Sequence, residues 1–326
     1  MEESDWSSDV CSSDLNANSG RFSPIWFENS SGSVDRVTLD VPAVTSNFTA
    51  GGIYVLGPRG EVAIRDSVVA GRGGAVTQLL AIENVVDSTT VVERCDFSSI
   101  QSGPTRTTGL FASNSTFVVR ESRFDVPGTS QAVFGFDVTT AARGRIEQSR
   151  FLSHGTPTVT QHSIGGRVTA DASLELYNNW FVANGPAGAF SAGLWLDGDF
   201  SVRAIGNTIE GGGTAGQPGE SIGVRCDVTP GQGQATWSSN IVDGGLAATH
   251  FMVRDTAVTA KGTLLLATAA ATTDVPSGKV ALLLAPASRS VIGADGSLLR
   301  RAKNSGVKPL TEAALALAPC ASRNLI

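Results

Sequence analysis

Three aspartates and one arginine in the middle of the chain are the residues most able to do chemistry. Asp171, Asp197 and Asp199 are followed closely by Arg203. Hydrolysis of a glycosidic bond uses two carboxylates about 5 to 9.5 Å apart, whereas elimination uses carboxylates that hold calcium beside a basic side chain. These four residues are the candidate catalytic residues. The other interpretation of the aspartates is turn formation, which Asp beside Gly favours.

Aromatic residues near these acids could bind a sugar ring. Trp180 and Trp195, together with Asp197 and Asp199, are expected to line a ligand groove, because aromatic faces stack on sugars. The motif described below predicts that Trp180 and Trp237 point outward. Trp195 is either exposed in the groove or buried in the core.

Histidine and cysteine spacing indicates no metal site. His154, His162 and His250 lack a ligand spacing such as HExxH, so no metal or cofactor is expected. Calcium enters only if the chain is a lyase. Cys226 and Cys320 either form a disulfide or remain free buried thiols.

The charge balance does not favour a nucleic-acid partner. The chain of 326 residues has a net charge of −6, but five of its 30 acidic residues and none of its 24 basic residues lie within residues 1–15. Residues 16–326 therefore have a net charge of −1, which indicates neither a basic nucleic-acid surface nor an acidic surface. No run of 18 apolar residues occurs, so no membrane-spanning helix is expected.

The elements that must position the candidate residues repeat. A six-residue motif recurs about every 28 residues, with a small and mostly polar fourth residue and an apolar sixth residue. Its copies are IRDSVV (64–69), VERCDF (92–97), VRESRF (119–124), IEQSRF (146–151), LYNNWF (176–181), AIGNTI (204–209) and TWSSNI (236–241). Helical periodicity is missing and β-branched residues, Phe, Gly, Asn and Ser dominate, which predicts strands and tight turns.

Such units are predicted to be coils of a parallel β-solenoid, which stack about 4.8 Å apart so that equivalent residues lie over one another. Phe124, Phe151 and Phe181 are then expected directly above one another in an inward column. The fourth position gives a second column, whose side chains can hydrogen-bond between coils. Its members are Ser67, Cys95, Ser122, Ser149, Asn179, Asn207 and Ser239.

The two residues before the fourth position break strict alternation, so the chain is expected to bend there and to point both outward. Down the stack, the first residue runs Arg65, Glu93, Arg120, Glu147 and the second runs Asp66, Arg94, Glu121, Gln148. Opposite charges one strand apart attract, so the alternation favours in-register coils. The alternative is a random solvated surface.

Counting back from the fourth position places the acids in columns. Asp171 and Asp199 both precede it by 8 residues and belong to neighbouring coils, with Asp197 close by. Asp137 and Asp227 both precede it by 12 residues, so they are expected to share a column three coils apart, too far to cooperate.

The segments ESRF, NNWF and NTIEGG, with the Ser/Asn column and glycine turns, resemble the right-handed parallel β-helix proteins of the pectin-lyase-like superfamily over residues 51–270. The resemblance implies right-handed coils with three short sheets. The superfamily includes lyases, glycoside hydrolases, phage tailspikes, adhesins and non-catalytic surface proteins. The NTD, DD, GHG and RIK-type segments expected of a polygalacturonase-like site do not occur in this sequence.

We therefore predict an all-β fold, a right-handed parallel β-helix of about eight coils with a short C-terminal helical cap. Residues 1–15 are expected to be a disordered artefact, because residues 5–15 (DWSSDVCSSDL) resemble a translated sequencing adapter. Residues 16–50 are expected to form an N-terminal partial coil or cap, residues 51–270 the β-helix, and residues 271–326 a C-terminal coil and cap.

The sequence favours a non-catalytic extracellular or cell-surface module with a structural, adhesive or polysaccharide-binding role. Its expected partner is a polysaccharide or a cell-surface component, and its expected state is a monomer, with a trimer as the alternative. The competing interpretation is a polysaccharide lyase or glycoside hydrolase that acts on an acidic polysaccharide in the groove. Convergence of Asp171, Asp197 and Asp199 beside an arginine would favour the enzyme, and their separation into turns would favour the binding module.

Overall fold

The computed structural model describes most of the chain between residues 21 and 300. The described residues are 21–41, 49–57, 60–72, 76–101, 105–128, 130–155, 162–185, 190–212, 221–227, 233–243, 249–254, 257–261, 264–266, 282–284, 291–292 and 298–300. All regular elements within these ranges are strands. The expected artefact at residues 1–15 and the expected C-terminal helical cap lie outside the described residues.

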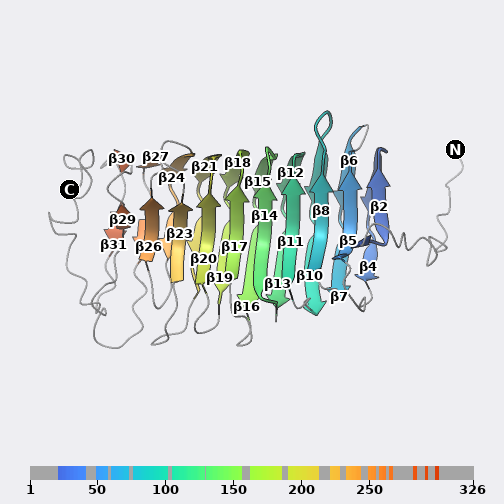
Figure 1. Cartoon of the computed structure of the whole chain (residues 1–326), viewed down its shortest axis with the longest axis horizontal. Coiled ribbons are helices and arrows are strands. Elements are labelled where there is room, and N and C mark those ends of the chain that lie inside the picture. The colour runs from blue at the N-terminus through green and yellow to red at the C-terminus, as the bar shows by residue number, and fades with distance from the viewer. Residues whose placement is uncertain are drawn as a thin grey trace, which may run out of the picture.

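Parallel strands form three sheets that run side by side along the long axis of the molecule (Figure 1). Sheet A has 11 strands and sheets B and C have 10 each. Along each sheet the neighbours are third in chain order, because each coil gives one strand to every sheet before the chain returns. The chain is therefore an all-β parallel solenoid, as predicted. Each sheet follows a path of ten strands, so the coil number differs slightly from the expected eight.

The strand bounds are as follows. Sheet A contains β1 (Arg21–Phe22), β2 (Ile25–Glu28), β5 (Thr49–Leu56), β8 (Val76–Glu83), β11 (Arg106–Ser113), β14 (Ala132–Thr139), β17 (His162–Thr169), β20 (Phe190–Asp197), β23 (Ser221–Asp227), β26 (Thr249–Arg254) and β29 (Leu282–Leu284). Sheet B contains β3 (Gly32–Asp35), β6 (Val62–Arg65), β9 (Thr90–Glu93), β12 (Thr116–Arg120), β15 (Arg143–Glu147), β18 (Ala172–Tyr177), β21 (Phe200–Ile205), β24 (Gln234–Ser238), β27 (Ala257–Lys261) and β30 (Val291–Ile292). Sheet C contains β4 (Thr38–Val41), β7 (Val68–Arg72), β10 (Asp96–Gln101), β13 (Arg123–Gly128), β16 (Arg150–Gly155), β19 (Trp180–Asn184), β22 (Thr208–Glu210), β25 (Ile241–Asp243), β28 (Leu264–Leu266) and β31 (Leu298–Arg300).

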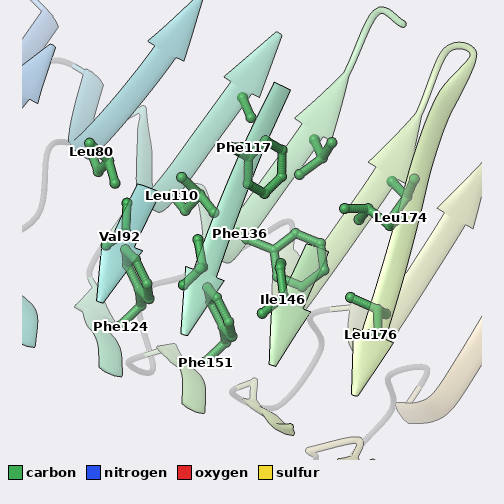
Figure 2. Packing of buried hydrophobic residues seen from close by; sticks show 14 of the residues in the cluster. Leu80, Val92, Leu110, Phe117, Phe124, Phe136, Ile146, Phe151, Leu174 and Leu176 are labelled. Atoms are coloured by element: carbon green, nitrogen blue, oxygen red, sulfur yellow. The ribbon is translucent and has the colours of Figure 1, made fainter. Parts of the chain in front are cut away.

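A column of phenylalanines forms part of the core, as predicted. Phe124 stacks on Phe97 and on Phe151 with ring centroids 4.7 Å apart in both pairs, and Phe151 stacks on Phe181 at 5.7 Å. All four rings are fully buried, and Phe136 from sheet A meets Phe151 edge-on at 5.1 Å. Figure 2 shows Phe124 and Phe151 side by side on successive strands. Stacked rings of this size remove a large apolar area from water and fix the distance between coils.

The polar column between sheets B and C is a hydrogen-bonded ladder. Each ladder side chain accepts a hydrogen bond from the backbone N–H of the ladder residue one coil earlier: Cys95 N–H donates to Ser122 Oγ at 3.1 Å, and Ser149 N–H donates to Asn179 Oδ1 at 2.9 Å. The Asn179 side chain also donates to Asn207 Oδ1 at 3.0 Å. The predicted column is therefore confirmed from Ser67 to Asn207, and it satisfies backbone groups where the chain turns.

At the last copy of the motif the predicted alignment is wrong by one residue. Asn207 N–H donates to Asn240 Oδ1 at 2.8 Å, so Asn240 and not Ser239 is the ladder residue. Trp237 pairs with Ala204 in sheet B and is 0% exposed, contrary to the predicted outward position. A shift of one residue moves every strand side chain to the opposite face, which accounts for both errors.

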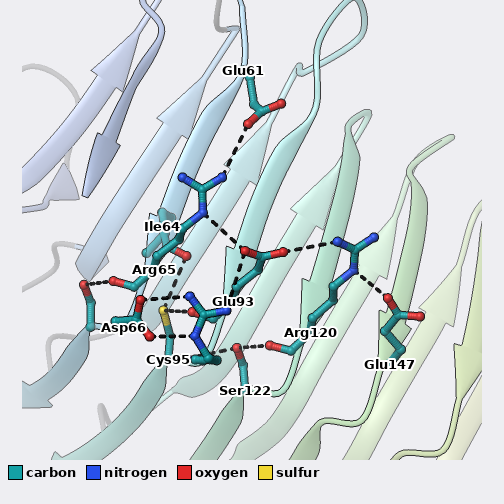
Figure 3. Close-up of polar contacts among 11 residues, drawn as sticks. Glu61, Ile64, Arg65, Asp66, Glu93, Cys95, Arg120, Ser122 and Glu147 are labelled. Carbon is teal, nitrogen blue, oxygen red and sulfur yellow. Dashed lines mark hydrogen bonds and ion pairs between the residues drawn. The ribbon is translucent and has the colours of Figure 1, made fainter. Parts of the chain in front are cut away.

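The bend before each ladder residue is made by left-handed backbone. Asp66, Arg94, Glu121 and Gln148 have φ between 47° and 52°. The predicted charge alternation is also confirmed. Glu93 pairs with Arg65 at 3.2 Å and with Arg120 at 3.1 Å, and Arg120 pairs with Glu147 at 2.5 Å (Figure 3). These pairs are largely exposed, so they fix register more than they stabilise the fold.

The corrected ladder predicts different effects at two adjacent residues. Asn240→Ala removes the acceptor for two Asn207 N–H groups and the donor to Ala204 O, and we expect it to lower the free energy of unfolding by about 2 kcal/mol. Ser239→Gly should change stability by less than about 1 kcal/mol, because Ser239 is exposed with φ 55° and glycine accepts this conformation. Urea denaturation measures both. A larger loss at Ser239 would restore the original alignment.

Candidate functional site

The outer face of sheet A carries the densest group of charged and aromatic side chains among the described residues. We refer to this group as the arginine–aromatic cluster. It comes from five successive strands, β11, β14, β17, β20 and β23, and consists of Arg106, Phe134, Asp137, His162, Arg167, Phe190, Trp195 and Arg225.

A column of glycines explains why two rows of side chains face outward here. The pairing of β11 with β14 passes over Gly109 and Gly135, and a Cβ on Gly109 would lie 2.4 Å from the carbonyl oxygen of Gly135. The same close approach recurs at Gly165 and Gly193. This irregularity breaks alternation. Phe136 therefore packs in the core, whereas Phe134, two residues earlier, contacts arginines on the outer face.

Asp137 lies at the centre of the cluster, where it is 0% exposed. Arg167 donates from Nε and Nη2 to the two carboxylate oxygens of Asp137 at 2.8 Å each. Arg106 forms a second ion pair with Asp137 from the strand on the other side. Bidentate geometry makes such pairs strong and directional, so Asp137 holds two guanidinium groups in place over the sheet.

Aromatic rings separate the guanidinium groups. The Phe134 ring lies between Arg106 and Arg167, whose Cζ atoms are 4.8 and 4.7 Å from its centroid. Trp195 lies between Arg167 and Arg225, at 5.7 and 5.6 Å. Distances within about 6 Å of a ring are favourable for a cation. Stacking of coils therefore alternates cation and ring along the axis.

His162 and Phe190 stand at the starts of β17 and β20, beside these arginines. The His162 ring lies 5.7 Å from the Phe190 ring and 5.8 Å from the Trp195 ring. Arg225 Cζ is 4.8 Å from the Phe190 ring. The cluster thus extends to the edge of sheet A where the strands begin.

The electrostatics of the cluster follow from burial and crowding of positive charge. Burial, with the charge of Arg167, lowers the pKa of Arg106 to about 10. Burial also lowers the pKa of Arg167, although Asp197 acts in the opposite direction. The pKa of His162 is lowered by burial and then by Arg167 and Arg225. At neutral pH both arginines are charged and His162 is neutral.

A smaller group lies on the same face nearer the N-terminus. Arg21 Cζ lies 3.9 Å from the Tyr54 ring, and its Nη2 pairs with Glu83 at 2.9 Å. The Tyr54 hydroxyl donates to Glu83 at 3.2 Å, and Trp26 meets the Tyr54 ring edge-on at 4.8 Å. Burial, opposed by Arg21 and aided by Glu83, raises the pKa of Tyr54 to about 12.

The structure distributes the predicted site residues over several faces. Asp171 and Asp199 lie in turns between sheets A and B of neighbouring coils, where Asp171 N–H donates to the Asp199 carbonyl, and Asp171 has φ 63°. Asp197 ends β20 on the edge of the arginine–aromatic cluster. Arg203 is exposed on sheet B, paired in register with Glu175.

The two tryptophans of the predicted groove also separate. Trp195 belongs to the arginine–aromatic cluster on sheet A, whereas Trp180 lies on sheet C, 38% exposed. Trp180 Nε1 donates to Glu210 at 2.8 Å, and Arg150 covers its ring at 4.0 Å. Of the expected groove residues, the structure brings together Trp195 and Asp197, and it places Trp180 on another side of the solenoid.

The expected column of Asp137 and Asp227 is wrong. Asp137 is in register with Arg167, Trp195 and Arg225, while Asp227 is in register with Asp197. The error comes from counting back from Ser239 instead of Asn240. Sequence reasoning also missed Arg106, Phe134 and Phe190 as members of one site, although the recurring glycine of the second apolar segment could have revealed their common face.

Metal-binding and membrane-spanning features were sought in the described part of the chain. There, no three His, Cys, Asp or Glu side chains lie close enough to share a metal ion. Within the same residues, no helix has the length and apolar character needed to cross a membrane. Cys95 is a free buried thiol, whereas the side chain of Cys226 and all of Cys320 lie outside the described residues.

Comparison of the sequence with protein-family models and with curated proteins gives no match.

Asp137 should be essential for this face. Asp137→Asn leaves Arg106 and Arg167 without a counter-charge in a buried setting, and we expect it to lower the free energy of unfolding by about 3 kcal/mol. The matched control is Asp125→Asn on sheet C, which loses the half-exposed pair with Arg123 and should change stability by less than about 1 kcal/mol. Chemical denaturation compares the two. Equal effects would mean that the Asp137 ion pairs do not organise the cluster.

Proposed function

We propose that this protein is a non-catalytic β-helix module that binds an acidic polysaccharide along the outer face of sheet A. The observation that carries the proposal is the alternation of Arg106, Arg167 and Arg225 with aromatic rings on that face. Guanidinium groups recognise carboxylate and sulfate groups, and aromatic rings stack on the apolar faces of sugars.

The arrangement suits an extended ligand. Equivalent residues repeat along the solenoid axis with the spacing of the strands, about 4.8 Å, so a chain of charged sugar units lying along the axis meets a cation or a ring on each coil. The three arginines exceed Asp137 and Asp197 in charge, which leaves the face net positive. Long-range attraction of a polyanion follows from such a local excess, although residues 16–326 as a whole are nearly neutral.

Membership of the pectin-lyase-like superfamily, right-handed coiling and an extracellular or cell-surface location form part of the same proposal. They are supported by the three-sheet parallel coil, by the Ser/Asn ladder and by the resemblance of the repeated motifs. The proposed state is a monomer that needs no cofactor. An adhesive or purely structural role uses the same surface without saccharide recognition.

A second candidate is a polysaccharide lyase, favoured by one observation. Arg106 is buried beside Arg167, with its pKa lowered to about 10. Elimination next to a uronic-acid carboxylate needs a base to remove the proton beside that carboxylate and a positive charge to stabilise the resulting anion. Arg106 and Arg167 would take these roles. Calcium, if required, would have to bridge the ligand and acids such as Asp197.

Binding is tested with polygalacturonate, dextran sulfate and neutral dextran. We expect the protein to bind the two acidic polymers and not the neutral one, with affinity that falls as salt rises. Arg225→Ala should weaken binding about tenfold, because one cation and its ring contacts are lost. The matched control is Arg203→Ala, which removes an exposed arginine from sheet B and should leave affinity unchanged. Equal loss in both variants would indicate non-specific attraction and refute the proposed face.

Catalysis is tested separately by saccharide release. The protein is incubated with polygalacturonate with and without calcium, and unsaturated and reducing ends are measured. We expect no release under either condition. Unsaturated ends that disappear in Arg106→Lys would establish the lyase instead, and reducing ends without unsaturation would establish a hydrolase.

A further inference from the structure

Two ring nitrogens in the arginine–aromatic cluster have unused hydrogen-bonding capacity. Nδ1 of His162 and Nε1 of Trp195 are both buried, and neither has a hydrogen-bond partner among the described residues. Their rings lie 5.8 Å apart. A buried polar atom without a partner costs free energy, so a ligand group that accepts from both nitrogens would be favoured here.

The surroundings select a negative charge for that group. The Trp195 ring lies between Arg167 and Arg225, and Arg225 also covers Phe190, which touches His162. These two arginines are the charged groups that act on His162 from its own strand and from β23.

The remaining charged groups around β17 are already accounted for. On β14, Asp137 is held by Arg106 and Arg167, and on β20, Asp197 acts on Arg167. On β16, Arg150 covers Trp180, and His154 pairs with Asp125 and Asn184 on sheet C. β19 carries no ionisable side chain. No carboxylate of these strands therefore neutralises the space between His162 and Trp195.

We propose that His162 and Trp195 form a subsite that binds a single carboxylate or sulfate group, and that His162 takes up one proton when that group binds. Trp195 donates from Nε1, and protonated His162 donates from Nδ1. The subsite rests on the proposed function, since it assigns to one pair of residues the recognition of one acidic group of the polysaccharide.

Proton uptake follows from linkage. In the free protein, burial, Arg167 and Arg225 lower the pKa of His162 below its ordinary value of about 6.5. A bound anion between the rings opposes these effects and raises that pKa. Affinity is then highest at low pH and falls by up to about tenfold per pH unit between the lower pKa of the free protein and the higher pKa of the complex.

Four variants of the full chain test the contacts. Trp195→Phe keeps a ring but loses Nε1–H, and we expect affinity for dextran sulfate to fall about tenfold at pH 5.5. His162→Asn keeps an amide N–H near the position of Nδ1 but cannot titrate, so its affinity should not depend on pH between 5 and 8. The matched controls are Trp180→Phe and His154→Asn on sheet C, which should behave like the unchanged protein. Persistence of the pH slope in His162→Asn, or unaltered affinity in Trp195→Phe, would overturn the subsite.

A direct measurement separates this inference from polysaccharide binding. The imidazole resonance of His162, assigned with His162→Asn, is titrated in sodium galacturonate, in sodium sulfate and in sodium chloride of equal ionic strength. We expect galacturonate or sulfate to raise the pKa of His162, while His154 responds equally to all three salts. The stronger of the two anions identifies the group. If neither anion moves His162 beyond chloride, the subsite is refuted whether or not the polymers bind; if His162 responds but the polymers do not bind, only the proposed function fails.

Discussion

Parallel pairing of each coil with the next places every residue within about 4.8 Å of its counterpart in the neighbouring coils. A residue must therefore be compatible with the same position above and below it. Rings stack on rings from Phe97 to Phe181, and ladder side chains bond to the next ladder residue. Where the chain comes closest, at Gly109, Gly135, Gly165 and Gly193, no side chain fits at all. The repeated motif is the record of this requirement in the sequence.

The same requirement shapes the outer surface differently from the core. Like charges one coil apart repel, so ionised residues can stack only when their signs alternate or when a ring lies between them. The column from Glu61 to Glu147 uses the first solution with exposed side chains. The arginine–aromatic cluster uses both, because Asp137 separates Arg106 from Arg167 and Trp195 separates Arg167 from Arg225. Such spacing gathers positive charge on one face at low electrostatic cost, which is the physical basis for proposing an acidic ligand there.

Errors in reading the sequence came from places where a single residue is inserted or passed over. A longer connection before the last motif copy moved the ladder from Ser239 to Asn240, and this shift reversed Trp237 and misplaced Asp227. In sheet A, the glycine irregularity places Phe134 outside and Phe136 inside. Strict alternation would have put the two rings on the same side. Counting along the chain cannot detect such steps, because both registers give a similar pattern of apolar residues.

The sequence alone determined the parallel coil, the stacked phenylalanines, the polar ladder and the alternating charges, because each is a local pattern repeated at a fixed interval. Tertiary structure alone decided which side chains share the outer face of sheet A. Arg106, Asp137, Arg167, Trp195 and Arg225 come from five separate coils, and no two of them are neighbours in the sequence. Their meeting depends on the strand register and on the glycine irregularity, which together set the direction of each side chain. The acids Asp171, Asp197 and Asp199 are close in sequence, yet the turns direct two of them to a corner of the coil and leave one on the face.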